Sequence, residues 1–181
     1  MEDFEGALQR TEEYRRMAEI TQSRSAFTEY LMYLAVIHSS RDRKEDLEQS
    51  MKYVQKAIRL ARKEPFIYGE YSLWNIRAQI AQKMGRSEEA LKYSQQASDL
   101  FQKQPHEEEM GVEIQFTRYQ ILKDLGRLQE AEEALSESFG ILKKLAKNIE
   151  SEEFRKSFWE VPLRRRVAEA AREVGLESSQ K

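Results

Sequence analysis

One stretch of the chain, residues 71–103, constrains the fold more than any other: YSLWNIRAQIAQKMGRSEEALKYSQQASDLFQK. Small and apolar residues recur at helical spacing before Gly85 and again after it, at Trp74, Ala78, Ala81, Ala90 and Ala97. Glycine readily adopts the left-handed conformation that ends a helix, and Ser87 can cap the helix that follows. The stretch therefore predicts two helices joined by a tight turn.

This helical hairpin recurs along the chain. Gly126 lies 41 residues after Gly85, and Ala131 lies 41 residues after Ala90, while the pair Tyr53 and Ala57 precedes Tyr93 and Ala97 by 40 residues. A fixed period of about 40 residues with two helices per unit is the signature of an α-solenoid. We therefore expect an all-α fold, an α–α superhelix of antiparallel helix hairpins.

The composition agrees with amphipathic helices. Only 3 of the 181 residues are proline and 7 are glycine, while 34% are charged and 40% are hydrophobic. A net charge of -2 provides no basic field for nucleic acid or an anionic membrane, and the absence of cysteine excludes disulfides and thiolate metal sites. With neither a long apolar run nor a basic signal sequence, we expect a cytoplasmic protein with no membrane partner.

The period divides the chain into one repeat domain over residues 1–175 and a flexible tail, 176–181. Within the domain we expect a half repeat (1–23), three repeats (about 25–63, 66–103 and 107–147) and a C-terminal capping pair of helices (151–175), with Asp3 as a helix cap and Pro65 and Pro105 at boundaries. The half repeat begins like the second helix of a hairpin. We therefore expect it to leave an apolar face uncovered, so that the chain is either cut from a longer protein or pairs there with another copy.

The hairpin at residues 71–103 resembles a tetratricopeptide repeat (TPR), because the motif's aromatic, small, turn-glycine and two further small positions are occupied by Trp74, Ala78, Gly85, Ala90 and Ala97. The longer period is similar to the repeats of kinesin light chains and of the sensor regions of bacterial signalling ATPases. The resemblance extends over about residues 3–145, with departures at Tyr119, where a small residue is usual, and at Ser50, which replaces alanine in a first unit whose turn lacks glycine. It implies a right-handed superhelix that binds a peptide or a helix of a partner protein.

In this family the partner lies on the concave face, which is lined by the first helix of each hairpin. Projected through the repeat, that face contains Leu31, Leu34, His38, Asn75, Gln79, Gln82, Phe116, Gln120 and Lys123. Amide groups there can hydrogen-bond a peptide backbone, and apolar side chains can form pockets. The alternative for Leu31, Leu34 and Phe116 is a purely structural place in the core. The family's carboxylate clamp is not completed around Asn75, which disfavours chaperone tails as partners.

The one basic cluster is the run Arg164, Arg165 and Arg166 in the first turns of a helix, where positive charge opposes the helix dipole. Three roles are open for it: an intramolecular or solvated one, a contact with an acidic partner such as residues 107–109 of another copy, and binding of nucleic acid. Trp159 and Trp74 are more typical of core anchors than of ligand platforms.

The sequence gives little support to an enzymatic function. His38 and His106 are far apart in sequence and fall in no metal-binding spacing, and neither a Gly-rich phosphate loop nor a GxSxG motif is present. We expect a packing or capping role for His38, a solvated loop for His106, and no cofactor. The sequence predicts a non-catalytic protein-interaction module that binds a partner protein or associates with itself. The alternatives are a regulatory or sensor domain excised from a larger signalling protein and, more weakly, an enzyme on a helical scaffold.

Overall fold

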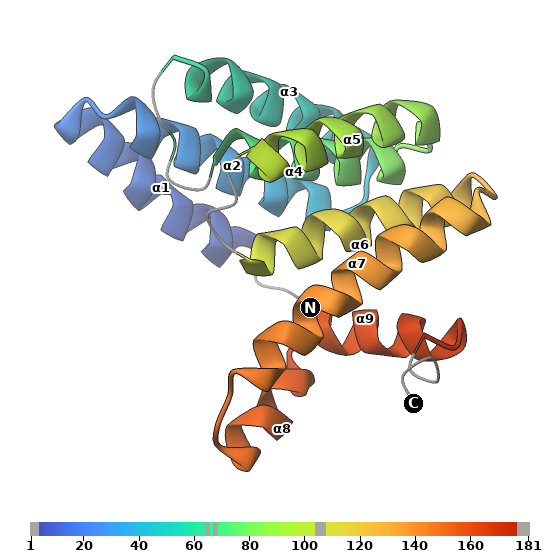
Figure 1. Ribbon diagram of the computed structural model, residues 1–181. Coiled ribbons are helices and arrows are strands. Elements are labelled where there is room, and N and C mark those ends of the chain that lie inside the picture. The colour runs from blue at the N-terminus through green and yellow to red at the C-terminus, as the bar shows by residue number, and fades with distance from the viewer. Residues whose placement is uncertain (1–3, 64–65, 67–68, 104–107, 177–181) are drawn as a thin grey trace. The chain divides into compact units, whose positions relative to one another are not determined.

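The computed structural model describes residues 4–63, 66, 69–103 and 108–176, and every regular element in this part of the chain is a helix (Figure 1). The helices are α1 (Phe4–Thr21), α2 (Arg24–Ser40), α3 (Lys44–Ala61), α4 (Gly69–Lys83), α5 (Ser87–Lys103), α6 (Glu108–Asp124), α7 (Leu128–Lys147), α8 (Glu152–Glu160) and α9 (Pro162–Glu173). The predictions made for Asp3, Pro65, Pro105, His106 and most of the tail lie outside the described residues.

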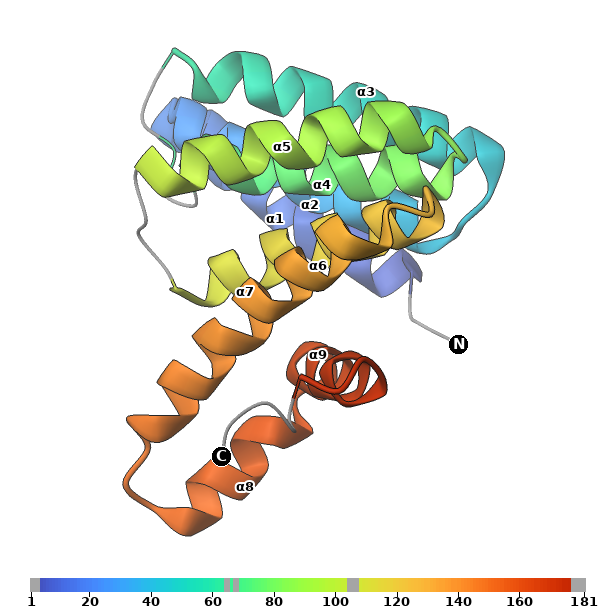
Figure 2. The ribbon, with the colours of Figure 1, turned by 45° about the vertical axis from the view of Figure 1, so that its right-hand side comes forward.

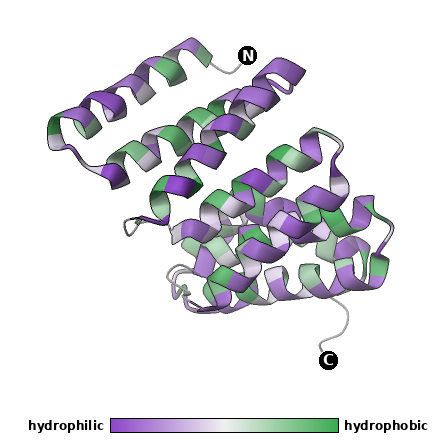
Figure 3. Cartoon of the chain, turned by 90° about the horizontal axis from the view of Figure 1, so that it is seen from above, coloured by the Kyte–Doolittle hydropathy of each residue, from purple (hydrophilic) through white to green (hydrophobic). Residues whose placement is uncertain are grey.

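The helices form where the sequence predicted them, with small shifts at the ends. Ser23 caps α2, because its hydroxyl accepts a hydrogen bond from the N–H of Ala26 at 3.2 Å. Ser151 caps α8 in the same way through the N–H of Phe154. Ser87, predicted as a cap, is instead the first residue of α5. Hydrophobic and hydrophilic residues are interspersed along the helices (Figure 3).

The chain forms two compact units, Met1–Leu100 and Phe101–Lys181, called here the N-terminal and C-terminal units. In the N-terminal unit α2 packs against α1, α3 and α4, and α3 packs against α4. The apolar character of α2 around more than one face follows from these three neighbours. The core of this unit includes Leu31, Ala35, Val54, Ala57, Ile58, Leu73, Ala78 and Ile80.

In the C-terminal unit α6 and α7 form the hairpin, and α7 and α8 both pack against α9 (Figure 2). The hydroxyl of Ser138 on α7 donates a 2.9 Å hydrogen bond to the carbonyl of Val112 on α6, and both residues are fully buried. The core includes Ile114, Ile121, Leu122, Leu135, Leu142 and Val167. The final helix thus belongs to the same core as the hairpin.

The hairpin turns fix the register of the repeat. Gly85 and Gly126 have φ of +71° and +73°, which confirms the left-handed turns predicted for them, and the first hairpin has Asp42 at φ +58° in the corresponding place. The second helices begin at Lys44, Ser87 and Leu128, so the first interval is 43 residues and the second is 41.

An ion pair recurs in the same register at the start of each second helix. It joins an arginine to the acidic residue three positions later: Arg43 to Asp46, Arg86 to Glu89 and Arg127 to Glu130. The residue that follows each acid donates its N–H to the arginine's carbonyl, and these residues are Leu47, Ala90 and Ala131. Leu47 thus has the same place relative to the turn as Ala90 and Ala131, while Ser50, which lies 40 residues before Ala90, is fully buried as Ala90 is.

Candidate functional site

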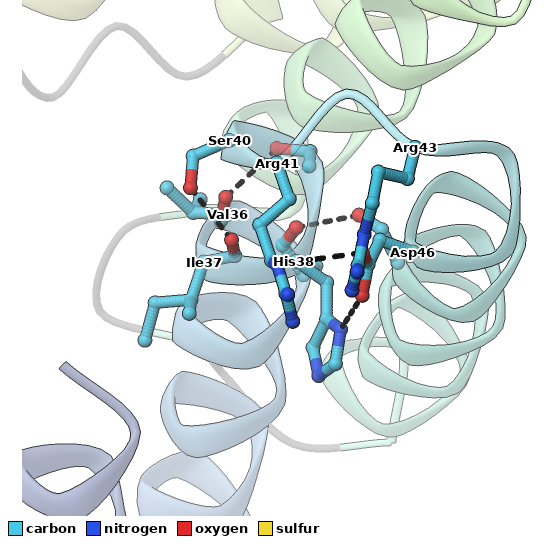
Figure 4. Close-up of polar contacts among 10 residues, drawn as sticks. Val36, Ile37, His38, Ser40, Arg41, Arg43 and Asp46 are labelled. Carbon is cyan, nitrogen blue, oxygen red and sulfur yellow. Dashed lines mark hydrogen bonds and ion pairs between the residues drawn. The ribbon is translucent and has the colours of Figure 1, made fainter. Parts of the chain in front are cut away.

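His38 belongs to a polar cluster at the α2–α3 turn (Figure 4). Its Nδ1 lies 3.1 Å from Oδ1 of Asp46, and Nε of Arg43 donates to Oδ2 of the same carboxylate at 2.5 Å. Hydrogen bonds from Arg43 and His38, in that order of size, hold the pKa of Asp46 below its ordinary value. The His38 ring also packs against the rings of Phe4 and Tyr53. His38 therefore helps to close the turn, as expected for a packing or capping role.

The other two α2 residues of the predicted face point into the core. Leu31 is 2% exposed, and Leu34 is also buried. With the register set at 43 residues, the α2 positions equivalent to Gln79 and Gln82 are Val36 and Ser39, and Val36 is 45% exposed. The burial of Leu31 and Leu34 agrees with the alternative stated for them, a purely structural place in the core.

The residues predicted for the partner-binding face of α4 differ in their exposure. Asn75 is 1% exposed, whereas Gln79 and Gln82 are half-buried. The next residue, Lys83, donates from Nζ to the carbonyl of Ser39 at 2.8 Å, which brings the ends of α2 and α4 together. The N-terminal unit therefore places Val36 and Ser39 of α2 and the two glutamines of α4 on two packed helices.

Trp74 is a core anchor, as expected. Its indole N–H donates to Glu70 at 2.9 Å, and the Arg77 guanidinium lies 5.0 Å from the Trp74 ring centroid and 4.0 Å from that of Tyr93 on α5. These stacked groups join α4 to α5 and leave the indole ring 9% exposed.

On α6, Phe116 is 5% exposed because its own unit covers it. The ring stacks on Tyr119 at a centroid distance of 5.6 Å, and the Arg166 guanidinium of α9 lies 5.3 Å from the Phe116 centroid. Gln120 is half-buried and Lys123 is exposed. A hydrogen bond with the Tyr119 hydroxyl raises the pKa of Lys123 above its ordinary value. Gln120 and Lys123 are thus the accessible members of the predicted face on α6.

The three consecutive arginines of α9 point in different directions, because successive helical residues are about 100° apart. Arg164 donates to Glu109 of α6 at 2.6 Å and stacks 4.1 Å from the Phe158 ring centroid. Arg166 lies over Phe116, as described above. Arg165 forms a long 3.9 Å ion pair with Glu169 one turn away. The acidic contact considered for another copy is therefore made inside this chain, by Arg164.

Two cavities lie within single units. One of about 340 Å³ in the C-terminal unit is lined by Phe139, Trp159, Arg165, Ala168, Glu169 and Arg172. One of about 320 Å³ in the N-terminal unit lies beside the hairpin turns and is lined by Asp42, Lys44, Leu47, Glu48, Lys83, Met84 and Arg86.

Large apolar side chains are exposed on α1. Tyr14, Met17 and Ile20 follow one another at intervals of three residues, and Met17 and Ile20 are 63% and 81% exposed. The expected uncovered apolar face is therefore present on the half repeat.

Within the described ranges, no three histidine, aspartate or glutamate side chains are grouped so that they could hold a metal ion. Among the helices described, none has both the length and the apolar character required to cross a bilayer.

These features define a helical-repeat protein built from antiparallel hairpins, with accessible polar side chains on α4 and α6. Residues 71–104 match the family model for the tetratricopeptide repeat, so the central hairpin is similar to a TPR. TPR repeats commonly mediate protein–protein interactions, and the fold is typically a non-catalytic scaffold.

The comparison with solved structures agrees with this class. The chain is similar to BtubC (BKLC) from P. vanneervenii, known from a crystal structure, with a TM-score of 0.63 and 19% sequence identity. The match covers 78% of this chain and 56% of BtubC, so it spans little more than half of that protein's length. At this identity the similarity shows the fold alone, and it confirms the predicted α–α superhelix class. No curated protein sequence matches the chain.

Proposed function

We propose that this chain is a non-catalytic protein-interaction module whose partner contacts lie on the first helices of its hairpins. One observation carries the proposal: α4 and α6 keep polar side chains accessible at the same two repeat positions, 41 residues apart. These are Gln79 and Gln82 on α4, and Gln120 and Lys123 on α6. An amide side chain both donates and accepts hydrogen bonds, so it can pair with an extended peptide backbone or with a polar helix face.

The positions one turn earlier on the two helices support this assignment. Asn75 and Phe116 are buried there, so the accessible polar residues are the ones available for partner contacts. In the N-terminal unit the register adds Val36 as an apolar neighbour on α2. A peptide that combines backbone hydrogen bonds with an apolar side chain suits such a surface.

Selection of binding peptides from a random library against the whole chain tests the proposal. We expect Gln79→Ala combined with Gln82→Ala to weaken a selected peptide by about fivefold or more, from the loss of two hydrogen bonds. Gln96→Ala, the same change at an exposed position of α5, should leave the affinity unchanged. Equal affinities for the three proteins, or no enrichment of any peptide, would contradict the proposal.

The second candidate function is self-association through the half repeat, and the exposed row Tyr14, Met17 and Ile20 on α1 favours it. Light scattering coupled to size-exclusion chromatography tests it directly. We expect the wild-type chain to dimerise and Ile20→Glu to be monomeric, since a buried carboxylate in an apolar interface is costly. Leu128→Glu, at another exposed apolar residue, is the matched control and should still dimerise. A monomeric wild type at high protein concentration would reject this candidate.

A further inference from the structure

The cavity between α7, α8 and α9 has the size of a peptide side-chain pocket. Its volume of about 340 Å³ lies near the lower end of the range for ligand pockets, roughly 300–1,000 Å³. All six lining residues belong to the C-terminal unit. The cavity therefore suits one or two side chains of an extended segment.

One wall of the cavity is aromatic. Phe139 is buried, and its ring centroid lies 6.3 Å from that of the half-buried Trp159, whose ring packs edge-on against Phe158 at 5.2 Å. These contacts fix the indole ring in place. A ligand with an apolar or aromatic group complements this wall.

The rim of the cavity carries positive charge. Arg165, Glu169 and Arg172 are spaced by four and three residues on α9, so they share one face of that helix. The Lys143 ammonium adds a further cation 4.9 Å from the Phe139 ring centroid. The lining itself contains two arginines and one glutamate, so its formal charge is positive and favours an anionic ligand.

Arg165 is the rim residue best placed to change partners. Its ion pair with Glu169 is 3.9 Å long and exposed on both sides, and such pairs contribute little to stability. A ligand carboxylate can therefore replace Glu169 at small cost and form a shorter pair with the guanidinium. Arg164 and Arg166 do not share this position, because they contact Glu109 and Phe116.

We propose that this cavity binds an acidic peptide segment, with an apolar or aromatic side chain against Trp159 and a neighbouring carboxylate paired with Arg165. Glu169 lies between the two arginines and repels a polyanion, and the chain's net charge of -2 gives no wider basic field, so a peptide carboxylate fits better than nucleic acid. The proposal does not rest on partner contacts of α4 and α6, since the cavity lies on other helices.

The two tryptophans allow a direct test by NMR of the indole ¹⁵N–H signals in the full chain. The probe is a five-residue peptide with a central phenylalanine flanked by two glutamates on each side, and its matched controls have alanine at the centre or lysines at the flanks. We expect only the first peptide to shift the Trp159 signal in a saturable way. The Trp74 signal is the internal reference, because that indole N–H is bonded to Glu70 in the N-terminal unit.

Four variants complete the test. Arg165→Gln should weaken binding about two- to fivefold, the contribution expected of one exposed charge pair, and Glu169→Gln should strengthen it because it removes the competing carboxylate. Lys156→Gln on α8 makes the same charge change away from the cavity and should have no effect, and Ala168→Leu should abolish binding by filling the space.

Three results would overturn the proposal. The first is an absent or non-saturable shift of the Trp159 signal with the acidic peptide. The second is equal loss of affinity in Arg165→Gln and Lys156→Gln. The third is tighter binding of the lysine-flanked peptide, or of a ten-nucleotide oligothymidylate, than of the acidic one, because the site would then recognise a different class of ligand.

Discussion

Two glycines of the C-terminal unit allow the backbone contribution of a repeat turn to be measured without a change in contacts. Gly126 has φ +73° at the α6–α7 turn, and Gly140 lies at an exposed position inside α7. A Cβ atom added at either residue would meet no heavy atom within 4 Å. The substitution to alanine is therefore the same chemically at both places and differs only in backbone conformation.

The expected effects have opposite signs. A left-handed residue with a side chain costs roughly 1–2 kcal/mol, and the lower entropy of unfolded alanine returns about 0.4–1 kcal/mol, so Gly126→Ala should lose about 1 kcal/mol of stability. Within a helix alanine is favoured over glycine by roughly 0.5–1 kcal/mol, so Gly140→Ala should gain that amount. The two variants should differ by about 1.5–2 kcal/mol.

Urea denaturation at 25 °C, followed by the helical circular dichroism signal, measures this difference. We expect the midpoint to fall for Gly126→Ala and to rise for Gly140→Ala, with similar slopes for both. If both midpoints fall, or if Gly126→Ala leaves stability unchanged, the left-handed backbone conformation is not the reason that glycine is favoured at position 126.

Three further predictions concern the turns and the interhelix hydrogen bonds. Ser138→Ala should destabilise the chain by about 1 kcal/mol in the same urea assay, because it removes the buried hydrogen bond to the Val112 carbonyl. An unchanged midpoint would show that this hydrogen bond makes no net contribution to stability. Asp42→Gly should stabilise the chain by about 0.5 kcal/mol, since glycine adopts the φ of +58° without strain, and a loss of stability would show that the aspartate side chain matters more than its backbone. Arg43 lowers the pKa of Asp46, so the carboxylate's contribution to folding stability is complete above the ordinary pKa of 3.8 and is lost as pH falls through the lowered pKa. The difference in melting temperature between wild type and Asp46→Asn should therefore disappear only in acid. A difference that stays constant with pH would contradict this.

The sequence was sufficient to predict the helices and the two glycine turns, because these depend on local patterns. Gly85 and Gly126 mark chain reversals that few other residues adopt easily, and the apolar stripes on either side are long enough to specify helices. Tyr119 departs from the small residue usual at its position and is still buried, since it stacks on Phe116. The repeat accommodates the larger side chain by stacking it on this neighbouring ring.

A local sequence pattern was not sufficient to assign the α2 residues to the core or to the accessible face. The first turn uses Asp42 in a left-handed conformation, and the cluster of His38, Arg43 and Asp46 closes it, so no glycine marks the register. A shift of a few residues along a helix moves a position to another face, so the pattern alone left a core place and an accessible place open for Leu31 and Leu34, which are buried.

The burial of Phe116 also could not be predicted from the sequence pattern of one helix. Its burial depends on Arg166, 50 positions later in the chain, whose side chain lies over the ring. Helical periodicity places Phe116 on a face of α6 but carries no information about which distant residue covers that face. The contact between α6 and α9 is therefore a property of the tertiary structure alone.

The divergence of Arg164, Arg165 and Arg166 has a practical consequence for mutagenesis. Basic clusters are commonly tested by replacing every member at once, on the assumption that adjacent charges act as one patch. Here a triple alanine variant would break a bridge to Glu109, uncover an aromatic ring and remove one edge of a cavity in the same protein. Its phenotype would have three unrelated causes, so only single replacements can assign a role to each guanidinium.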